Sequence, residues 1–309
     1  MTILLTLFQI FLVLLLAPLS LGLVRKFKAF FQGRVGASIW LPYVCFATLL
    51  KKEMTISPVI SFVFRLSPFL VLGTTVLLVC VLPLVSTVTI FASLSNFMMV
   101  AGVLAMGSLY LVLGALDAGG GFGGIGATRE MTVSALSEVV IITVFASFAV
   151  AGNNAQISEM LSLGGSAIFS HPFLILSLIG LTLVALAENA RYPVDNPATH
   201  LELTMVHEAN ILEYSGPYLA MMEYAATVKL TIFSLLIANF VYPVVLVQFT
   251  LLGALGIVFL TIIKLVVVMF FLALLESLMA KMRFYRLQEY FSLAFLIAVL
   301  GFFLTILYP

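Results

Sequence analysis

Long apolar runs are the feature that most restricts how this chain can fold. About eight runs are long enough to cross the hydrocarbon of a bilayer, near residues 2–24, 65–86, 91–115, 131–151, 171–188, 228–247, 251–275 and 290–308. In hydrocarbon every backbone N–H and C=O must be bonded within the protein, which leaves only helices or a closed barrel. The runs lack the alternation of barrel strands. The sequence therefore predicts an all-α, polytopic membrane helix bundle of about eight transmembrane helices.

The composition excludes a water-soluble globule. Of the 309 residues, 63% are hydrophobic and 9% are charged, whereas soluble domains carry about 25% charged residues. The net charge of +1, without a basic run, also excludes nucleic acid as a partner. We expect one transmembrane domain over residues 1–309, with a first helix that is retained rather than cleaved as a signal peptide.

The basic residues predict the orientation of the chain. All but Lys264 of the 14 Lys and Arg residues lie in, or at the edge of, four alternate connections, at about 25–64, 116–130, 189–227 and 276–289. The positive-inside rule places such connections in the cytoplasm. We therefore expect a multi-pass protein of the plasma (inner) membrane, with both termini outside and a cytoplasmic working face.

Charged residues inside the predicted spans are candidates for ion transfer. Glu138 follows Glu130 by roughly 12 Å of helix, and Lys264 precedes Glu276 by roughly 18 Å. Ionisable groups at such depths are costly and commonly belong to proton relays. The alternative is a buried Glu–Lys pair that only fixes the packing of the helices.

The segment 189–227 is rich in carboxylates. Its prolines break the chain after the fifth span, and residues from Thr199 to Tyr214 then predict a short amphipathic helix. The carboxylates in and beside the segment are Glu188, Asp195, Glu202, Glu208, Glu213 and Glu223. Such a cluster could gather protons at the membrane surface. The alternative is a solvated cytoplasmic loop, although the apolar residues of the helix argue against it.

We find no pattern that predicts a cofactor or metal bound by this chain. His200 and His207 would lie about 10.5 Å apart along one helix, too far for one ion, although either could carry protons. GFGGIG (121–126) matches a dinucleotide fingerprint but follows a membrane helix, not a strand, so we expect it to form a tight cytoplasmic loop instead. The two cysteines are too few for an iron–sulfur cluster.

Three segments carry a resemblance to a known family. AENARYPVDNPATHLELTMVHEANILEYSG (187–216), GATREMTVSALSE (126–138) and LLESLMAKMRFYR (274–286) resemble motifs of the complex I membrane subunit that forms the floor of the quinone chamber. The chain is more similar still to the membrane anchor subunit of energy-converting group 4 [NiFe] hydrogenases, including formate hydrogenlyase. The resemblance extends over essentially the whole chain.

The resemblance implies a membrane subunit without independent catalysis. It would dock hydrogenase-like large and small peripheral subunits, contact antiporter-like membrane subunits, and relay protons or Na⁺ to couple electron transfer to ion translocation. The [NiFe] or iron–sulfur centres would lie on the partners. We expect the relay to use Glu138, Glu188, Asp195, Glu202, Glu213, Lys264 and Glu276. We expect docking to use Arg34, Asp117, Arg129, Glu130, Lys281 and Arg283.

Residues 32–53, which belong to the cationic and aromatic segment 25–53, depart from the family pattern. Ala37 stands where the family usually has proline, residues 45–47 lack an acid that is often found there, and Gln288 replaces a frequent proline further on. Cations mixed with aromatic residues suit a segment in the membrane interface, either as a lipid anchor or as a docking platform. The departures leave the docking partner open.

Three alternative functions remain open at this stage. The chain could form the quinone chamber of an NADH- or ferredoxin-dependent complex I-like dehydrogenase, with quinone as a further partner. It could be a stand-alone secondary transporter, although the sequence has no internal repeat with paired broken helices. It could also be a structural anchor whose carboxylates are inert.

Overall fold

The computed structural model describes residues 2–86, 89–161, 170–195, 205–243, 251–279 and 286–308. The predicted site residues Glu202, Lys281 and Arg283 lie outside these ranges, as does His200. The described elements are α1 (Thr2–Phe31), α2 (Leu41–Lys51), α3 (Phe62–Val81), the 3₁₀ helix η1 (Ala92–Leu94), α4 (Phe97–Asp117), α5 (Gly121–Gly152), α7 (Leu174–Glu188), α9 (His207–Ile211), α10 (Gly216–Val241), α11 (Leu251–Leu278) and α12 (Leu287–Leu307).

These elements form an all-α polytopic membrane bundle, as predicted. Within the described ranges, seven helices are long and apolar enough to cross a membrane, namely α1, α3, α4, α5, α10, α11 and α12. The eighth predicted span corresponds to α7, which is apolar but has only 15 residues. The placement of both termini outside stays a prediction.

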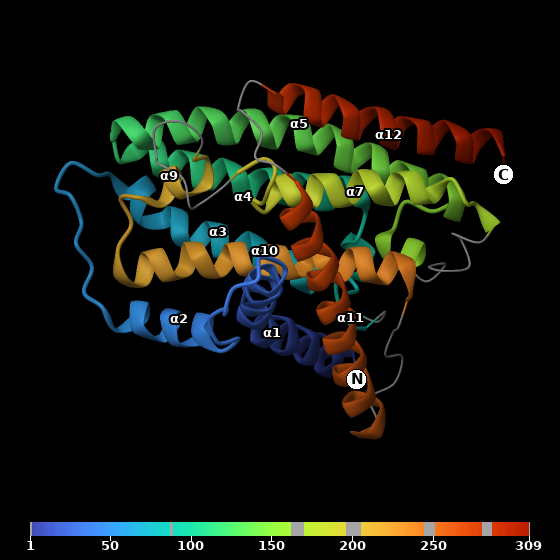
Figure 1. Cartoon of the computed structure of the whole chain (residues 1–309), viewed down its shortest axis with the longest axis horizontal. Coiled ribbons are helices and arrows are strands. Elements are labelled where there is room, and N and C mark those ends of the chain that lie inside the picture. The colour runs from blue at the N-terminus through green and yellow to red at the C-terminus, as the bar shows by residue number, and fades with distance from the viewer. Residues whose placement is uncertain are drawn as a thin grey trace.

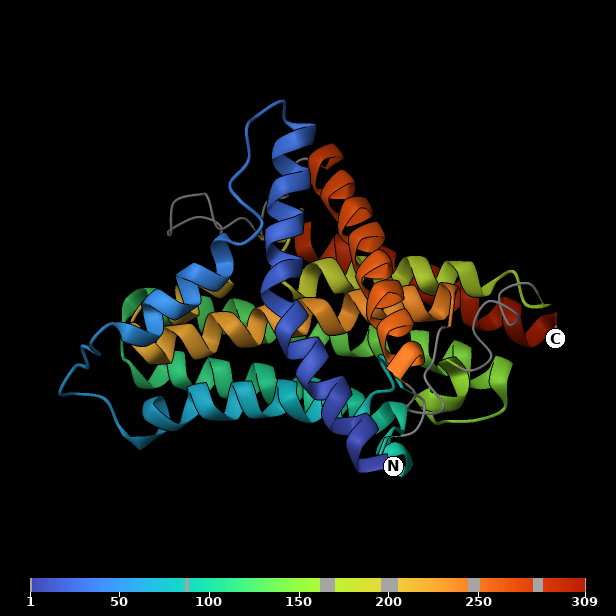
Figure 2. The same ribbon diagram turned by 90° about the horizontal axis from the view of Figure 1, so that it is seen from below.

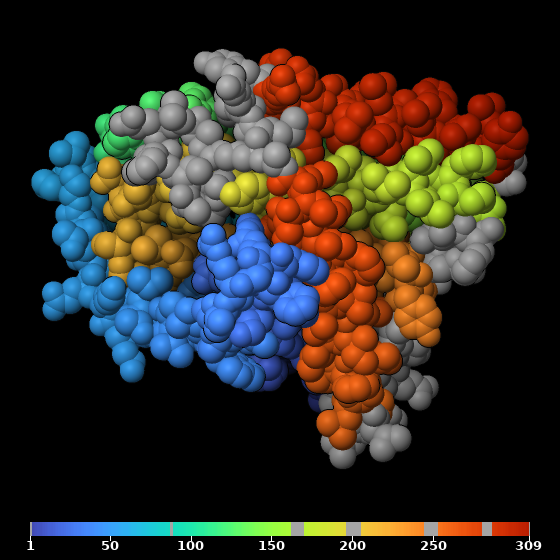
Figure 3. Space-filling model, in the orientation of Figure 1, coloured from blue at the N-terminus to red at the C-terminus, as the bar shows by residue number. Residues whose placement is uncertain are grey.

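The helices run in two principal directions. In Figure 1, α3, α4, α5, α10 and α12 lie along the length of the molecule, and α11 crosses them. Figure 2 shows α1 alongside α11, both steeply inclined to the other helices, and Figure 3 shows α11 at the surface of this face. Helix α10 contacts both groups. It is also the most enclosed span, with 78% of its apolar window buried, against 33–44% in the others.

The helices extend beyond the apolar runs from which they were predicted. Helix α5 begins at Gly121, so only residues 118–120 connect it to α4. GFGGIG therefore forms the first turns of α5, and the expected tight loop was wrong. A Cβ atom on Gly126 would lie 2.7 Å from Asn210 Oδ1 of α9. Glycine is needed at this position for the contact between α5 and α9, whereas Gly119, with φ of +65°, makes the turn.

The predicted amphipathic helix over residues 199–214 is shorter than expected. In the described part of this segment the helix covers only His207–Ile211. The residues after it form a turn, in which the Tyr214 N–H donates to the Ile211 carbonyl. The Tyr214 ring then stacks on Phe64, with 4.0 Å between the ring centroids. The aromatic contact holds the start of α10 against α3.

A single glutamine bonds an irregular stretch of backbone inside the bundle. Helix α3 ends at Val81, and residues 82–86 continue as buried, non-helical chain. Gln9 of α1, which is 0% exposed, donates from Nε2 to the carbonyls of Val79 and Leu82 at 2.7 Å each. Its Oε1 accepts from the N–H groups of Val85 and Ser86 at 3.1 and 3.0 Å. Non-helical backbone at membrane depth needs such partners.

We predict that Gln9→Leu destabilises the protein strongly. The substitution leaves four buried backbone groups without their present partner, and the free energy of unfolding should fall by about 3 kcal/mol or more. Denaturant unfolding of the purified chain in mixed micelles measures this change. Gln32→Leu, at an exposed position after α1, is the matched control and should change stability by less than about 0.5 kcal/mol. Equal effects of the two substitutions would contradict the assignment.

Candidate functional site

Two adjoining cavities lie where α7, α9 and α10 meet. The first, with a volume of about 60 Å³, has apolar walls from α3, α4 and α10 and ends at Glu130, Glu188 and Lys229. The second, of about 260 Å³, is bordered by α1, α10, α11 and the chain after α7. Asn189, Ala190, His207 and Ala226 line both cavities. We call the end of the bundle that contains them the cavity end.

A buried ion pair closes the first cavity. Lys229 Nζ of α10 lies 2.5 Å from Glu188 Oε2, at the end of α7, and both side chains are largely buried. The Ser137 hydroxyl of α5 donates to the other carboxylate oxygen of Glu188. Glu130, nearer the start of α5, is buried and lines the same cavity. Three helices therefore meet at one carboxylate.

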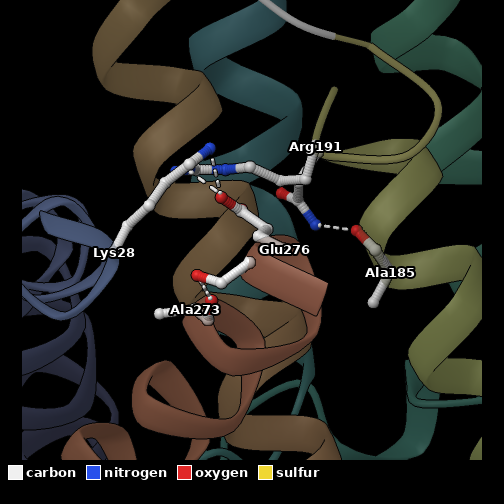
Figure 4. Close-up of polar contacts among 7 residues, drawn as sticks. Lys28, Ala185, Arg191, Ala273 and Glu276 are labelled. Atoms are coloured by element: carbon white, nitrogen blue, oxygen red, sulfur yellow. Dashed lines mark hydrogen bonds and ion pairs between the residues drawn. The ribbon is translucent and has the colours of Figure 1, made fainter. Parts of the chain in front are cut away.

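A second buried carboxylate holds two cations. Glu276 of α11 has a side chain that is 1% exposed, with Lys28 Nζ of α1 at 3.0 Å and Arg191 Nη1 at 3.5 Å. Figure 4 shows Lys28 and Arg191 reaching this carboxylate from different segments of the chain. The Lys28 ammonium also lies 4.2 Å from the centre of the Tyr192 ring. All four residues line the second cavity.

Asp195 positions α9 between the two cavities. It is buried, and its Oδ2 accepts from the N–H groups of Val206 and His207 at 3.2 and 3.1 Å. A carboxylate at this position binds the free N–H groups at the start of a helix. Asp195 therefore determines where the His207 ring lies.

Burial changes the pKa values of both titratable residues of α9. It lowers the pKa of His207, because desolvation disfavours the imidazolium. It raises the pKa of the neighbouring Glu208 carboxyl, although His207 opposes this shift. Near neutral pH the pair therefore combines an imidazole that resists protonation with a carboxyl that holds its proton more readily than an exposed one.

The comparisons with known proteins identify the family of this chain. The family model described as NADH dehydrogenase matches residues 3–307. The chain belongs to the NADH dehydrogenase family. It is 27% identical to hydrogenase-4 component C of Escherichia coli (strain K12) over 297 residues, which cover 95% of this chain and 92% of the relative. It is 26% identical to formate hydrogenlyase subunit 4 of the same organism over 290 residues, 92% of each chain.

A solved structure agrees with the fold. A chain of the membrane-bound sulfane sulfur reductase (MBS), an archaeal respiratory membrane complex, superposes with a TM-score of 0.83 at 18% identity, covering 98% of this chain and 99% of the other. The resemblance inferred from the sequence motifs is thus confirmed. The chain is a membrane subunit of a complex I-like or hydrogenase-type respiratory complex.

In this member of the NADH dehydrogenase family, three of the residues predicted for the relay meet at the cavities. Glu188 lines the first cavity, and Asp195 and Glu276 line the second. Glu213 is exposed, with its carboxylate beside Gly120. Glu138 is half-buried on α5 and lines neither cavity. Lys264 lies apart from the cavities as well, and its Nζ donates to Asn239 Oδ1 at 2.6 Å.

The residues predicted for docking have varied surroundings. Arg34 is exposed. Asp117 accepts hydrogen bonds from the N–H groups of Ser61 and Phe64 and from the Ser61 hydroxyl, so that it caps α3. Arg129 donates to the Met205 carbonyl at 3.3 Å. Glu130 is buried at the first cavity. Within the family fold, Asp117 and Arg129 thus also connect elements of this chain.

The sequence reasoning missed most of the cations of the site. Lys28, Arg191 and Lys229 served only to predict orientation, and Ser137 was not considered. Glu208 and Glu223 were counted among the acids of their segment but not singled out. A usable signal was present, because Lys28 and Lys229 stand close to the ends of the predicted spans 2–24 and 228–247, where a lysine can reach a buried carboxylate.

We predict a strong coupling between Glu188 and Lys229. Lys229→Met leaves a buried carboxylate without its cation and should lower the free energy of unfolding by about 3 kcal/mol. Combining it with Glu188→Gln should cost less than the sum of the two single substitutions, by about 1 kcal/mol or more. Denaturant unfolding of the four proteins measures this cycle, with the exposed Lys51→Met as control. Additive effects would contradict a direct pair.

We predict that His207 makes stability depend on pH. Below the ordinary pKa of 6.5, the unfolded chain takes up a proton at this residue and the folded chain resists it, so stability falls as the pH falls. His207→Gln should remove up to about 1.4 kcal/mol of this loss per pH unit. Unfolding at pH 7.5 and pH 5.5 compares the two proteins. Gln32→Leu, at an exposed position that does not titrate, should keep the wild-type difference; the idea fails if His207→Gln keeps it too.

Proposed function

We propose that this chain docks the peripheral redox arm of its respiratory complex and relays protons, or Na⁺, so that electron transfer is coupled to ion translocation. The observation that carries the proposal is the adjacency of the two cavities through His207, with buried carboxylates and cations on both sides. Buried charge is costly, and clusters of this kind commonly mark ion paths in membrane proteins.

In this proposal, protons enter the chain at the second cavity. Glu208, Glu223 and Asp195 line it, and the exposed Glu213 and the acidic Glu202 extend the same segment of the sequence. Burial raises the pKa of Glu208, so this carboxyl takes up a proton from water more readily than an exposed glutamate. The exposed Arg34 and the connections at this end provide the docking surface for the peripheral arm.

Transfer to the first cavity passes His207. Its Nε2 is buried and, within the described part of the chain, makes no hydrogen bond, so it can accept a hydrogen bond from a water molecule that carries the proton past the ring. Beyond it lie Glu130 and the Glu188–Lys229 pair. A proton that reaches Glu188 neutralises the carboxylate and removes the attraction that holds Lys229. The ammonium group of Lys229 then acts on neighbouring charges, and such interactions are strong where the dielectric constant is low.

Coupling to the redox arm works through Glu276. Two cations share this carboxylate, and charges interact strongly where water is scarce. A charge that arrives on a docked partner shifts the balance among Lys28, Arg191 and Glu276, and with it the affinity of the second cavity for protons.

Glu138 is the proposed exit from the chain. It lies within a span, is half-buried, and has no hydrogen bond or ion pair with another described residue. Intramembrane carboxylates normally face protein or a hydrated cavity. A neighbouring antiporter-like membrane subunit at this flank of α5 would supply the next acceptor. Lys264 of α11, whose Nζ donates to Asn239 near the end of α10, lies apart from these residues.

A hydrogenase-type complex is the favoured setting. Both Escherichia coli relatives are components of such systems by name, hydrogenase-4 and formate hydrogenlyase. Partner subunits would then hold the [NiFe] and iron–sulfur centres. In a quinone-reducing complex the second cavity would receive a quinone head group, but its volume of about 260 Å³ lies below the usual range for such ligands.

Ion translocation by the assembled complex in proteoliposomes tests the proposal. In Glu188→Gln, the protons moved per electron should fall by about tenfold or more, while electron transfer continues in the presence of an uncoupler. Glu159→Gln is the matched control, because this exposed acid bonds to Asn154 away from the cavities. Translocation at the wild-type ratio in a normally assembled Glu188→Gln complex would favour an inert anchor. Ion flux through the isolated chain would favour a transporter.

A further inference from the structure

Helix α1 contains a proline near its middle. Pro18 has no backbone N–H, so the Leu14 carbonyl lacks its usual partner within the helix, and the proline ring pushes this carbonyl aside. Sharp bends in long helices occur at such positions. Figure 2 shows α1 changing direction along its length, with its second half beside α11. The bend therefore decides where the second half of α1 lies.

Two tyrosine hydroxyls bind the backbone at the bend. Tyr224 of α10 donates to the Leu14 carbonyl at 2.7 Å, which replaces the bond lost to the proline. Tyr43 of α2 donates to the Leu15 carbonyl at 2.6 Å, and the Leu19 backbone also bonds this hydroxyl. In a regular helix the Leu15 carbonyl and the Leu19 N–H pair with each other. The two hydroxyls therefore stabilise the bent form of α1.

Both hydroxyls are connected to α2. Tyr43 belongs to this helix, and Phe46 of the next turn packs edge-on against the Tyr224 ring, with 5.5 Å between the ring centroids. Helix α2 lies in the segment 25–53, for which the sequence predicts a lipid anchor or a docking platform. The contacts at the bend of α1 thus depend on where α2 lies.

The second half of α1 brings cations to the second cavity. Arg25 and Lys28 line this cavity, and Lys28 Nζ lies 3.0 Å from Glu276 Oε2. Lys28 follows Pro18 by ten residues, or roughly 15 Å of helix. A change of about 10° in the direction of this half therefore moves the backbone of Lys28 by roughly 2.5 Å. Such a shift is enough to separate the ion pair.

Aromatic contacts fix the same half of α1 against α11. Phe27 packs edge-on against Phe270 with 5.6 Å between the ring centroids, and the Phe31 ring lies 5.2 Å from the same ring. Glu276 is six residues further along α11. These rings and the Lys28–Glu276 pair belong to one contact between the two helices, so a change in the bend alters all of them.

We propose that Tyr43 and Tyr224 are positioning residues of the ion relay. Their hydroxyls hold the bend of α1, and the bend places Lys28 beside Glu276. In this way α2, in the expected docking segment, is connected to the charges of the second cavity. The inference rests on the proposed function for the role of Glu276, whereas the connection between the two hydroxyls and Lys28 is independent of it.

The distance between two spin labels in the assembled complex measures this connection. The labels are attached at the exposed positions Phe30→Cys at the end of α1 and Leu296→Cys of α12, with both native cysteines replaced by serine. Combining Tyr43→Phe with Tyr224→Phe keeps the rings and removes the hydroxyls, and should shift the mean distance by roughly 2 Å or more. Tyr308→Phe, at an exposed tyrosine after α12, is the control and should leave the distance unchanged. An unchanged distance in the double variant would overturn the proposal.

Ion translocation by the complex then tests whether the connection serves the relay. The number of ions moved per electron should fall about fivefold in the Tyr43→Phe, Tyr224→Phe variant, and by a similar factor in Lys28→Met. Combining all three substitutions should lower the ratio no further, because the hydroxyls act through Lys28. Additive losses, or a wild-type ratio despite the shifted distance, would overturn the positioning role. Failure of the proposed function is recognised separately, by a wild-type ratio in Glu188→Gln.

Discussion

Charge in hydrocarbon needs a partner, and the ion pairs at the cavity end meet this requirement by joining helices that are distant in the sequence. Glu188 and Lys229 connect α7 to α10, while Glu276 draws Lys28 of α1 and Arg191 toward α11. The residues that hold the packing together are therefore the residues that line the cavities. In the proposed relay, stability and ion transfer are coupled, because moving a proton onto either carboxylate weakens a contact between helices.

The chain between α7 and α10 is also rich in polar residues that both pack the helices and line the cavities. Asp195 binds the first N–H groups of α9, and Gly126 lets α9 approach α5. Each of these contacts restricts where His207 can lie. The short helix α9 is held by buried hydrogen bonds at its start and by close packing along its side, so the imidazole keeps its place without an ion pair to any described residue.

Buried polar groups have different kinds of partner at the two ends of the bundle. At the cavity end, carboxylates and cations compensate one another. At the other end, neutral side-chain amides satisfy buried backbone groups. Gln9 and Asn239 donate hydrogen bonds to carbonyls at the end of α3 and in the chain that follows it. Neutral amides can bind backbone groups without a countercharge. Lys264 is the exception, and its ammonium group donates a hydrogen bond to the side-chain amide of Asn239 near the end of α10.

The sequence by itself determined the class of fold, the approximate spans and the family. These follow from run length, from the need to bond every backbone group in hydrocarbon, and from motifs that are contiguous in the chain. It also located the acidic segment and part of the site, including Glu188, Asp195 and Glu276. Only the tertiary structure decided which charges meet. Glu130 and Glu138 share one helix, yet eight residues rotate the direction of a side chain by about 80°, so one lines a cavity and the other lies at a flank. Depth along a span can be counted from the sequence, but direction around the helix and the identity of the neighbouring helix arise from packing.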